Sequence, residues 1–134
     1  MTLRIINPPG LGTPKGYAHG VRAGNLLFVS GQIGRRRPDS TGANPDVPGF
    51  VPQFEAALEN VLTVVREAGG RPENLVELTI FVKNMDAYRA ARPALAKVWR
   101  RLLDRHYPAI TLVEVSDLFE KGTTVEIRAI AALE

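Results

Sequence analysis

Hydrophobic positions along the chain follow two spacings, one typical of helices and one typical of strands. Between residues 51 and 68 they return every three or four positions, as on one face of an amphipathic helix. Pro52 suits the first turn of this helix, where an N–H has no intrahelical partner, and Gly69-Gly70 predicts its end. A second helix is predicted over 86–105, where Pro93 falls within the first two turns and predicts a late start or a kink.

Six segments have the composition of β-strands. Two of them, 17–21 and 25–33, are joined across residues 22–25 and predict a hairpin. In the fourth segment the even positions are all apolar, and in the last one the odd positions from 125 onward are apolar, so each predicts one face toward a core. The predicted strands are 3–6, 17–21, 25–33, 75–82, 110–115 and 123–132.

The order of these elements predicts a single α+β domain over residues 1–134. It is a two-layer sandwich, in which a mixed sheet of about six strands is covered by two helices. The far face of the sheet is predicted to carry Leu27, Val29 and Phe81, and exposed apolar sheet area of this kind predicts an oligomer formed through the sheet. The segment 34–49, rich in Gly, Pro, Asp and Asn, is predicted to be the longest loop.

Composition removes several kinds of chemistry. The chain has no cysteine, and its two histidines lie in unrelated segments, so neither thiol chemistry nor a zinc site is expected. The net charge of +3 includes an arginine triplet at 35–37, for which a solvated loop is favoured over phosphate binding. No apolar run approaches the roughly 20 residues of a membrane span, and the N-terminus is unlike a signal peptide. A cytoplasmic protein without a membrane or nucleic-acid partner is expected.

The chain contains, in this order, the segments GYAHG, NLLFVSGQIG, FEAALENVLTVVREAGG, LVELTIFVKNM, YPAITLVEV and GTTVEIRAIAAL. Through these segments it resembles the reactive intermediate deaminase family, also called RidA, YjgF or L-PSP. The similarity runs from about residue 16 to residue 132, and its most specific pieces are LFVSGQI and VEIRAIA. It implies a chorismate-mutase-like subunit that assembles as a homotrimer, with small-molecule ligands in clefts between subunits. It also implies hydrolysis of enamines and imines to a 2-oxo acid and ammonia, with no metal and no organic cofactor.

The resemblance also implies candidate site residues at matching positions. Tyr17 matches an aromatic pocket residue at the start of a strand, and Ser30 and Gly31 match the strand that lines the cleft. Glu126 matches an acid that helps to position water or the amino group. The family's substrate-binding arginine follows Pro-Ala, and in this chain that place is occupied by Ile110.

An isoleucine in this place changes the expected chemistry. An arginine binds a carboxylate through two charge-assisted hydrogen bonds, and removing one partner of such a buried pair costs about 3–5 kcal/mol. Weak activity on 2-amino-acid-derived imines is therefore predicted, unless another cation reaches the pocket. Arg128 lies two positions beyond Glu126 on the same strand face, with an interface salt bridge as its alternative role. Arg92 on the second helix is the other candidate, with a solvated helix residue as the alternative.

Glu126 has two predicted states. Beside Ile110, burial would raise the pKa of its carboxyl group and make it a general acid, whereas a pair with Arg128 would keep it charged. Ser30 is not expected to be a triad nucleophile, because no motif places a histidine to activate it. Two functions stay open, a cofactor-free enamine/imine deaminase with altered specificity and a trimeric small-molecule-binding or regulatory protein without deaminase activity. RNA cleavage, attached to some family members, is the weakest alternative, since the charge is small and no stacking platform is predicted.

Overall fold

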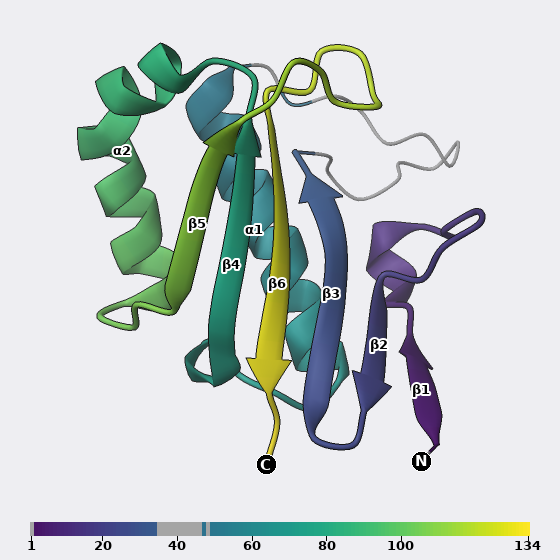
Figure 1. Ribbon diagram of the computed structural model, residues 1–134. Helices are drawn as coiled ribbons and strands as arrows, with labels where there is room; N and C mark the ends of the chain where they lie inside the picture. The colour runs from purple at the N-terminus through teal and green to yellow at the C-terminus, as the bar shows by residue number, and fades with distance from the viewer. Residues whose placement is uncertain (1, 35–46, 48) are drawn as a thin grey trace.

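The computed structural model describes residues 2–34, 47 and 49–134, which form a six-stranded sheet with two α-helices on one face (Figure 1). The strands lie in the order β1-β2-β3-β6-β4-β5, and only β4 and β5 are parallel neighbours. The predicted α+β sandwich with a mixed sheet is therefore confirmed. The elements are β1 (Leu3–Ile6), β2 (Gly20–Ala23), β3 (Leu26–Ile33), α1 (Phe50–Glu67), β4 (Leu75–Val82), α2 (Met85–Leu103), β5 (Ala109–Glu114) and β6 (Val125–Ala132), with short 3-10 turns at Pro9–Leu11 and Pro72–Asn74.

The hydrophobic core lies between the sheet and the two helices. The apolar stripe predicted for α1 is buried there, and so is the predicted inner row of β6. Most of the predicted 34–49 loop, with its arginine triplet, falls on residues 35–46 and 48, outside the described residues. The fully buried members of the two rows are Phe54, Leu58, Val61, Val65, Val125, Ile127, Ala129 and Ala131.

Truncating a core side chain of α1 tests this assignment. Leu62→Ala is expected to lower the free energy of unfolding by about 2–5 kcal/mol, because it leaves a cavity where Leu62 is fully buried. Urea denaturation followed by circular dichroism measures the loss. Lys97→Ala, on the exposed side of α2, is the control and is expected to change stability by no more than about 0.5 kcal/mol. Equal effects of the two substitutions would contradict the assigned core.

The first hairpin differs from its prediction in two ways. Its first strand is β2, which begins at Gly20, so Tyr17 lies in the preceding loop rather than at the start of a strand. The faces of β3 are also exchanged. Leu27 and Val29 are 0% and 2% exposed under the helices, so their predicted place on the far face was wrong. Apolar residues occupy both odd and even positions of β3, so the alternation of residue types did not show which face of the strand is buried.

Two further predictions, on the faces of β4 and on the start of α2, differ from the structure. A register shift between Leu75 and Glu77 turns Leu75 into the core and leaves Val76 44% exposed, the reverse of the predicted alternation. The helix α2 begins at Met85 and continues through Pro93. Of the two predicted effects of Pro93, the late start was wrong and the kink stays a prediction. The Asn84 side chain accepts a hydrogen bond from the backbone N–H of Ala87 at 3.0 Å and caps the first turn.

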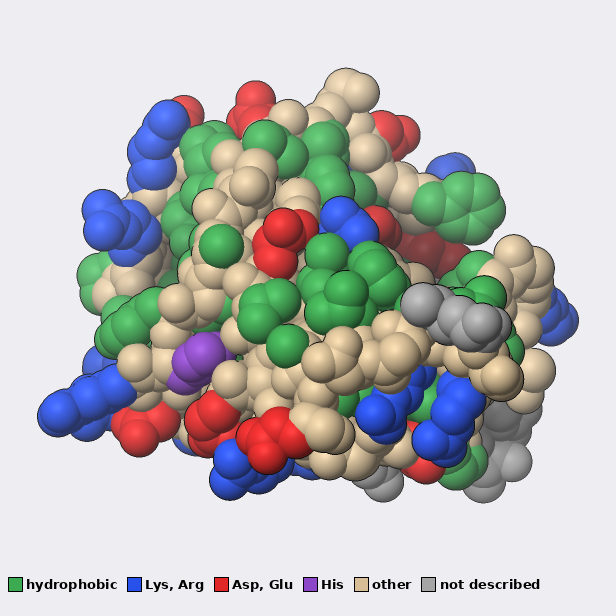
Figure 2. Space-filling model, turned by 60° about the horizontal axis from the view of Figure 1, so that its bottom comes forward, with side chains coloured by type: hydrophobic (Ala, Val, Ile, Leu, Met, Phe, Trp, Pro, Cys, Tyr) green, Lys and Arg blue, Asp and Glu red, His purple; other side chains and the backbone are tan. Residues whose placement is uncertain are grey.

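The second face of the sheet has no helix over it among the described elements (Figure 1). Figure 2, which turns the lower end of the sheet toward the viewer, shows hydrophobic side chains gathered in the middle of the molecule's surface, with charged side chains between and around them. We call this second side the open face. The predicted Phe81 lies on this face, in register with Glu126, whereas Leu27 and Val29 do not. The exposed apolar side chains of the open face, 37–60% exposed, are Leu3, Ile5, Leu26, Phe28, Val76 and Val113.

Candidate functional site

Glu126 lies on the open face near the start of β6. It is paired in register with Phe81 of β4 and Ile33 of β3, and its side chain is half-buried. Among the described residues its carboxylate has no hydrogen bond or ion pair. Burial therefore raises the pKa of the Glu126 carboxyl group, without an opposing charge partner.

Gly31 brings the backbone of β3 against this carboxyl group. The register of β3 on β6 shifts between Val29 and Gln32, which indicates a bulge at this point. A Cβ atom at residue 31 would collide with the Oε2 of Glu126 and would lie 2.7 Å from its Cδ. The position therefore requires glycine if the carboxyl group is to keep its place.

Tyr17 and Ser30 approach the same end of the sheet through His19, a residue that sequence reasoning did not select. The Ser30 hydroxyl donates to the carbonyl oxygen of His19 at 3.1 Å. The ring of Tyr17, which is 57% exposed, stands edge-to-face on the His19 ring, with centroids 5.6 Å apart. A chain of contacts thus links Tyr17 through His19, Ser30 and Gly31 to Glu126.

The two candidate cations are placed differently. Arg128 lies on the open face with Glu126, is half-buried, and is in register with Thr79 of β4. No ion pair of Arg128 occurs within the described part of the chain, so the predicted alternative of a charged Glu126–Arg128 pair is not formed there. Arg92 is exposed on α2, in the layer behind the sheet, and one chain does not bring it to Glu126.

Ile110 is separate from Glu126 within one chain. It is in register with Leu78, whose side chain faces the helices, so Ile110 points to that side of edge strand β5, where it is 45% exposed. Glu126 is in register with Phe81, which in turn is in register with Val113 of β5. Val113 lies three residues beyond Ile110, roughly 10 Å along the strand, and β6 lies two strand spacings from β5, also roughly 10 Å across the sheet. In Figure 1, β5 begins at the lower end of the sheet and β6 at the upper end. Ile110 is therefore outside the core, and Gly31 rather than Ile110 covers Glu126 in the chain itself.

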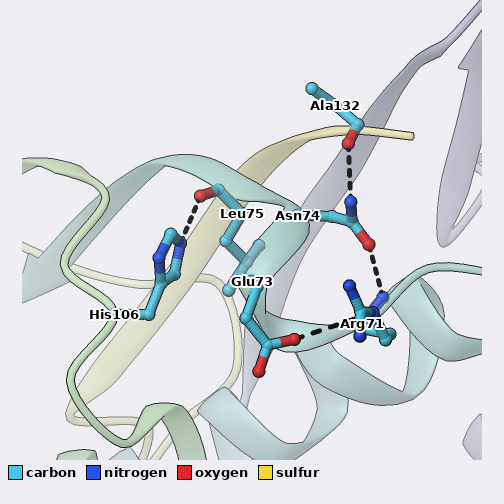
Figure 3. A network of polar contacts seen from close by, with 6 residues as sticks. All are labelled: Arg71, Glu73, Asn74, Leu75, His106 and Ala132. Carbon is cyan, nitrogen blue, oxygen red and sulfur yellow. Dashed lines mark hydrogen bonds and ion pairs between the residues drawn. The ribbon is translucent and has the colours of Figure 1, made fainter. Parts of the chain in front are cut away.

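A network of polar contacts fixes the connection that leads into β5 (Figure 3). His106 Nε2 lies 2.7 Å from the carbonyl oxygen of Leu75 and, facing an acceptor, carries the proton. Asn74 donates to the carbonyl oxygen of Ala132 at 3.0 Å and accepts from the backbone N–H of Arg71 at 2.7 Å. These bonds join the start of β4, the end of β6 and the segment before Ile110, so His106 has a structural role.

The raised pKa of Glu126 predicts a pH-dependent stability. The folded chain holds the proton more tightly than the unfolded chain, so the associated stability is fully present below the ordinary pKa of the carboxyl group and is lost as pH rises through the raised value. The free energy of unfolding of Glu126→Gln minus that of the wild type is therefore expected to be constant below the ordinary pKa. It is expected to increase as pH rises from the ordinary to the raised pKa. Urea denaturation over a pH series measures both curves, and parallel curves throughout would contradict a buried acid.

Comparison with known proteins places this geometry in a family. The model of the family described as endoribonuclease L-PSP matches residues 10–133. A 2-iminobutanoate/2-iminopropanoate deaminase of Dermatophagoides farinae is 31% identical over 133 residues, which cover 98% of this chain and 97% of that protein. A protein of the same name from Escherichia coli K12 is 33% identical over 134 residues, 97% and 95% of the two chains. This chain belongs to the RidA/YjgF/L-PSP family.

Solved structures of the RidA/YjgF/L-PSP family share the fold. The E. coli YjgF gene product aligns with a TM-score of 0.81 and 28% identity, over 96% of this chain and 98% of that one. A putative endoribonuclease of Thermotoga maritima aligns with a TM-score of 0.82 and 30% identity, over 98% of each chain. The resemblance inferred from the sequence is thus confirmed, together with the six-stranded sheet and its two helices.

Two further observations concern partners and location. Within the described residues, no helix is both long and apolar enough to cross a membrane, and no three His, Asp or Glu side chains are grouped as a metal site requires. A relative from Schizosaccharomyces pombe, 32% identical over 95% of each chain, is named as a mitochondrial protein. The expected cytoplasmic location therefore stays a prediction.

Proposed function

We propose that this protein is a cofactor-free enamine/imine deaminase with a specificity altered by Ile110, which stands in the place of the family arginine. The observation that carries the proposal is the half-buried Glu126 carboxyl group, which lies against Gly31 and has no charge partner among the described residues. Two relatives that match nearly the whole chain carry the name 2-iminobutanoate/2-iminopropanoate deaminase, which supports the reaction type.

The reaction needs one group that first gives and then takes a proton. Protonated Glu126 donates to the imine nitrogen, which makes the carbon of the C=N bond more electrophilic. Water adds to that carbon, and the Glu126 carboxylate takes a proton from the added water. The carboxyl group then protonates the amino nitrogen. As the C–N bond breaks and ammonia leaves, the Glu126 carboxylate takes the hydroxyl proton, so the hydroxyl oxygen becomes the carbonyl oxygen and the protonated acid is restored. A raised pKa favours this role because the acid is protonated closer to neutral pH.

The proposed site lies between copies of the chain in a homotrimer. Ile110 and Glu126 point to opposite sides of the sheet, and they are offset by roughly 10 Å along it and roughly 10 Å across it, so one chain cannot bring them together. A second copy against the open face would bring its edge strand β5 to the Glu126 end. It would also cover Phe28 and Val113, which a single chain exposes to water.

Ile110 determines the proposed specificity. Without a bidentate cation, the partner's end of the cleft favours an apolar substituent over a carboxylate. Tyr17 supplies an exposed aromatic wall, and Ser30 and Gly31 form the strand beside the acid. Arg128 is the better placed of the two replacement cations, because it shares the face of Glu126, whereas Arg92 does not.

Two other functions compete with this one. The missing arginine favours a trimeric small-molecule-binding or regulatory protein that has lost the chemistry. The family description names an endoribonuclease. The exposed aromatic residues Tyr17, Phe28, Tyr107 and Phe119 lie on four different elements or loops rather than on one surface that stacks successive bases, so RNA cleavage is not our proposal.

Imines generated in place separate the deaminase from the binding protein. An amino-acid oxidase produces imines that carry a carboxylate, and an amine oxidase acting on the matching decarboxylated amine produces imines that lack it. Ammonia release is followed with and without the protein. We expect acceleration for the uncharged imines and a weaker effect on their carboxylated counterparts. If neither series is accelerated for acidic, apolar or basic side chains, the binding function replaces the enzymatic one.

A further inference from the structure

His19 is a buried histidine for which the proposed reaction has no role. It lies just before β2 and is 5% exposed. One of its ring nitrogens faces a hydrogen-bond acceptor and the other faces a donor. Nε2 lies 3.3 Å from the carbonyl oxygen of Gly12, and Nδ1 lies 3.3 Å from the side-chain nitrogen of Gln32. Because a carbonyl oxygen only accepts, Nε2 carries the proton and Nδ1 accepts from the Gln32 amide. These two bonds hold the imidazole in one tautomer and one orientation.

The backbone of His19 is bonded at both of its polar groups. Its N–H donates to the side-chain oxygen of Asn7 at 2.9 Å. Its carbonyl oxygen accepts from the backbone N–H of Ser30 at 2.9 Å and from the Ser30 hydroxyl at 3.1 Å. Gln32, itself 5% exposed, also donates to the hydroxyl and carbonyl oxygens of Ser30 at 3.4 Å. His19 thus joins the N-terminal loop to the β3 segment at Ser30 and Gln32.

That segment is the β3 bulge, and it decides where Gly31 stands. The register of β3 on β6 is lost between Val29 and Gln32, so the sheet ladder does not by itself fix Ser30 and Gly31. The hydrogen bonds from His19 replace the missing ladder contacts on both sides of Gly31. Gly31 in turn is the part of β3 that lies directly against the Glu126 carboxyl group.

We propose that His19, together with Gln32, is a positioning residue that holds the β3 bulge, so that Gly31 stays against the Glu126 carboxyl group and Tyr17 stays against the His19 ring. The inference rests on the proposed function in one respect, since that function makes Glu126 the acid. It adds a residue that touches neither the substrate nor the acid and acts through the bulge. A buried network that bonds both ring nitrogens of His19 is suited to such a task, because it fixes the orientation of the ring between Gly12 and Gln32.

The test compares the same substitution at the only two histidines of the chain. His19→Leu removes both ring hydrogen bonds next to the bulge. His106→Leu removes the bond to Leu75 at the other end of the sheet and serves as the matched control. The measured quantity is the titration of the Glu126 carboxyl group, followed by NMR. In His19→Leu we expect the titration to move back toward ordinary glutamate values, and kcat for ammonia release to fall roughly tenfold or more.

Two variants keep the test decisive. His19→Gln retains one donor and one acceptor and is expected to keep the wild-type Glu126 titration. Gln32→Met keeps the side-chain size and removes the donor to Nδ1, so it carries the test if His19→Leu does not fold. The inference is overturned if Glu126 titrates as in the wild type in both His19→Leu and Gln32→Met, or if His106→Leu shifts it equally. Absence of ammonia release by the wild type would reject the proposed function alone, because the titration still decides the role of His19.

Discussion

Replacing Glu126 with glutamine is expected to slow ammonia release by about 10²–10⁴-fold, the usual contribution of a general acid–base residue. Glutamine has nearly the same size and still fits against Gly31, but it neither gives nor takes a proton in the reaction. Among the described residues on the open face, Glu126 is the acid whose pKa is raised by burial. The rate is measured with the best uncharged imine from the oxidase-coupled assay, and the native mass of the variant is measured by light scattering.

The control for this substitution is Glu73→Gln. Glu73 is exposed, and its carboxylate lies 3.9 Å from Arg71 (Figure 3). It precedes the start of β4, whereas Glu126 is in register with Phe81 near the end of β4, so Glu73 is remote from the proposed cleft. Its loss is expected to leave the rate within about twofold, since exposed ion pairs contribute little. A Glu126→Gln protein that assembles normally and keeps more than a tenth of the wild-type rate would remove Glu126 from the mechanism.

Ile110→Arg is expected to raise kcat/KM for 2-imino acids by on the order of 10²–10³-fold. The new guanidinium would supply the bidentate partner for the substrate carboxylate, and a partner of this kind in a desolvated site is worth about 3–5 kcal/mol. Since Ile110 is 45% exposed and outside the core, the longer side chain fits without repacking. The oxidase-coupled assay with matched imines, with and without a carboxylate, measures the gain.

The gain should depend on charge and on the carboxylate. Ile110→Met, which changes shape but adds no cation, is expected to leave the preference between the two imine series unchanged. With Ile110→Arg the uncharged imines should gain nothing. An equal response of both series, or no response in either, would show that residue 110 does not face the substrate carboxylate.

The elements and most of the core were predictable because hydrophobic spacing reports burial directly. The stripe of α1 and the inner row of β6 lie where the sequence placed them. Alternation failed where the backbone leaves regular geometry. The register shift after Leu75 exchanges the faces of two apolar neighbours, and β3 carries apolar residues on both parities. In β4 the alternation holds after the register shift, where Leu78, Ile80 and Val82 are buried as predicted, and it fails only before the shift.

The sequence proposed candidate site residues, but it did not predict how they are arranged. A raised pKa of the Glu126 carboxyl group was one of the two predicted states, but the group that lies against it in the chain is Gly31 rather than Ile110. His19 was missed because its partners Gly12, Ser30 and Gln32 come from separate segments and meet only after the hairpin has formed. The sequence offered one signal, a histidine just before Gly20 at the start of a strand. This signal does not distinguish a buried histidine that bonds several segments from an exposed loop histidine.

Mixing two inactive variants tests most directly whether one catalytic cleft draws on two copies of the chain. Glu126→Gln lacks the acid and keeps the other half of the cleft, whereas Ile110→Asp keeps the acid and places a charge in the apolar half. When equal amounts are unfolded and refolded together, random assembly in a closed ring leaves about one quarter of the clefts with both halves intact. We predict that the mixture recovers about one quarter of the wild-type ammonia release. Release no higher than the average of the two variants refolded separately would contradict a cleft shared between copies.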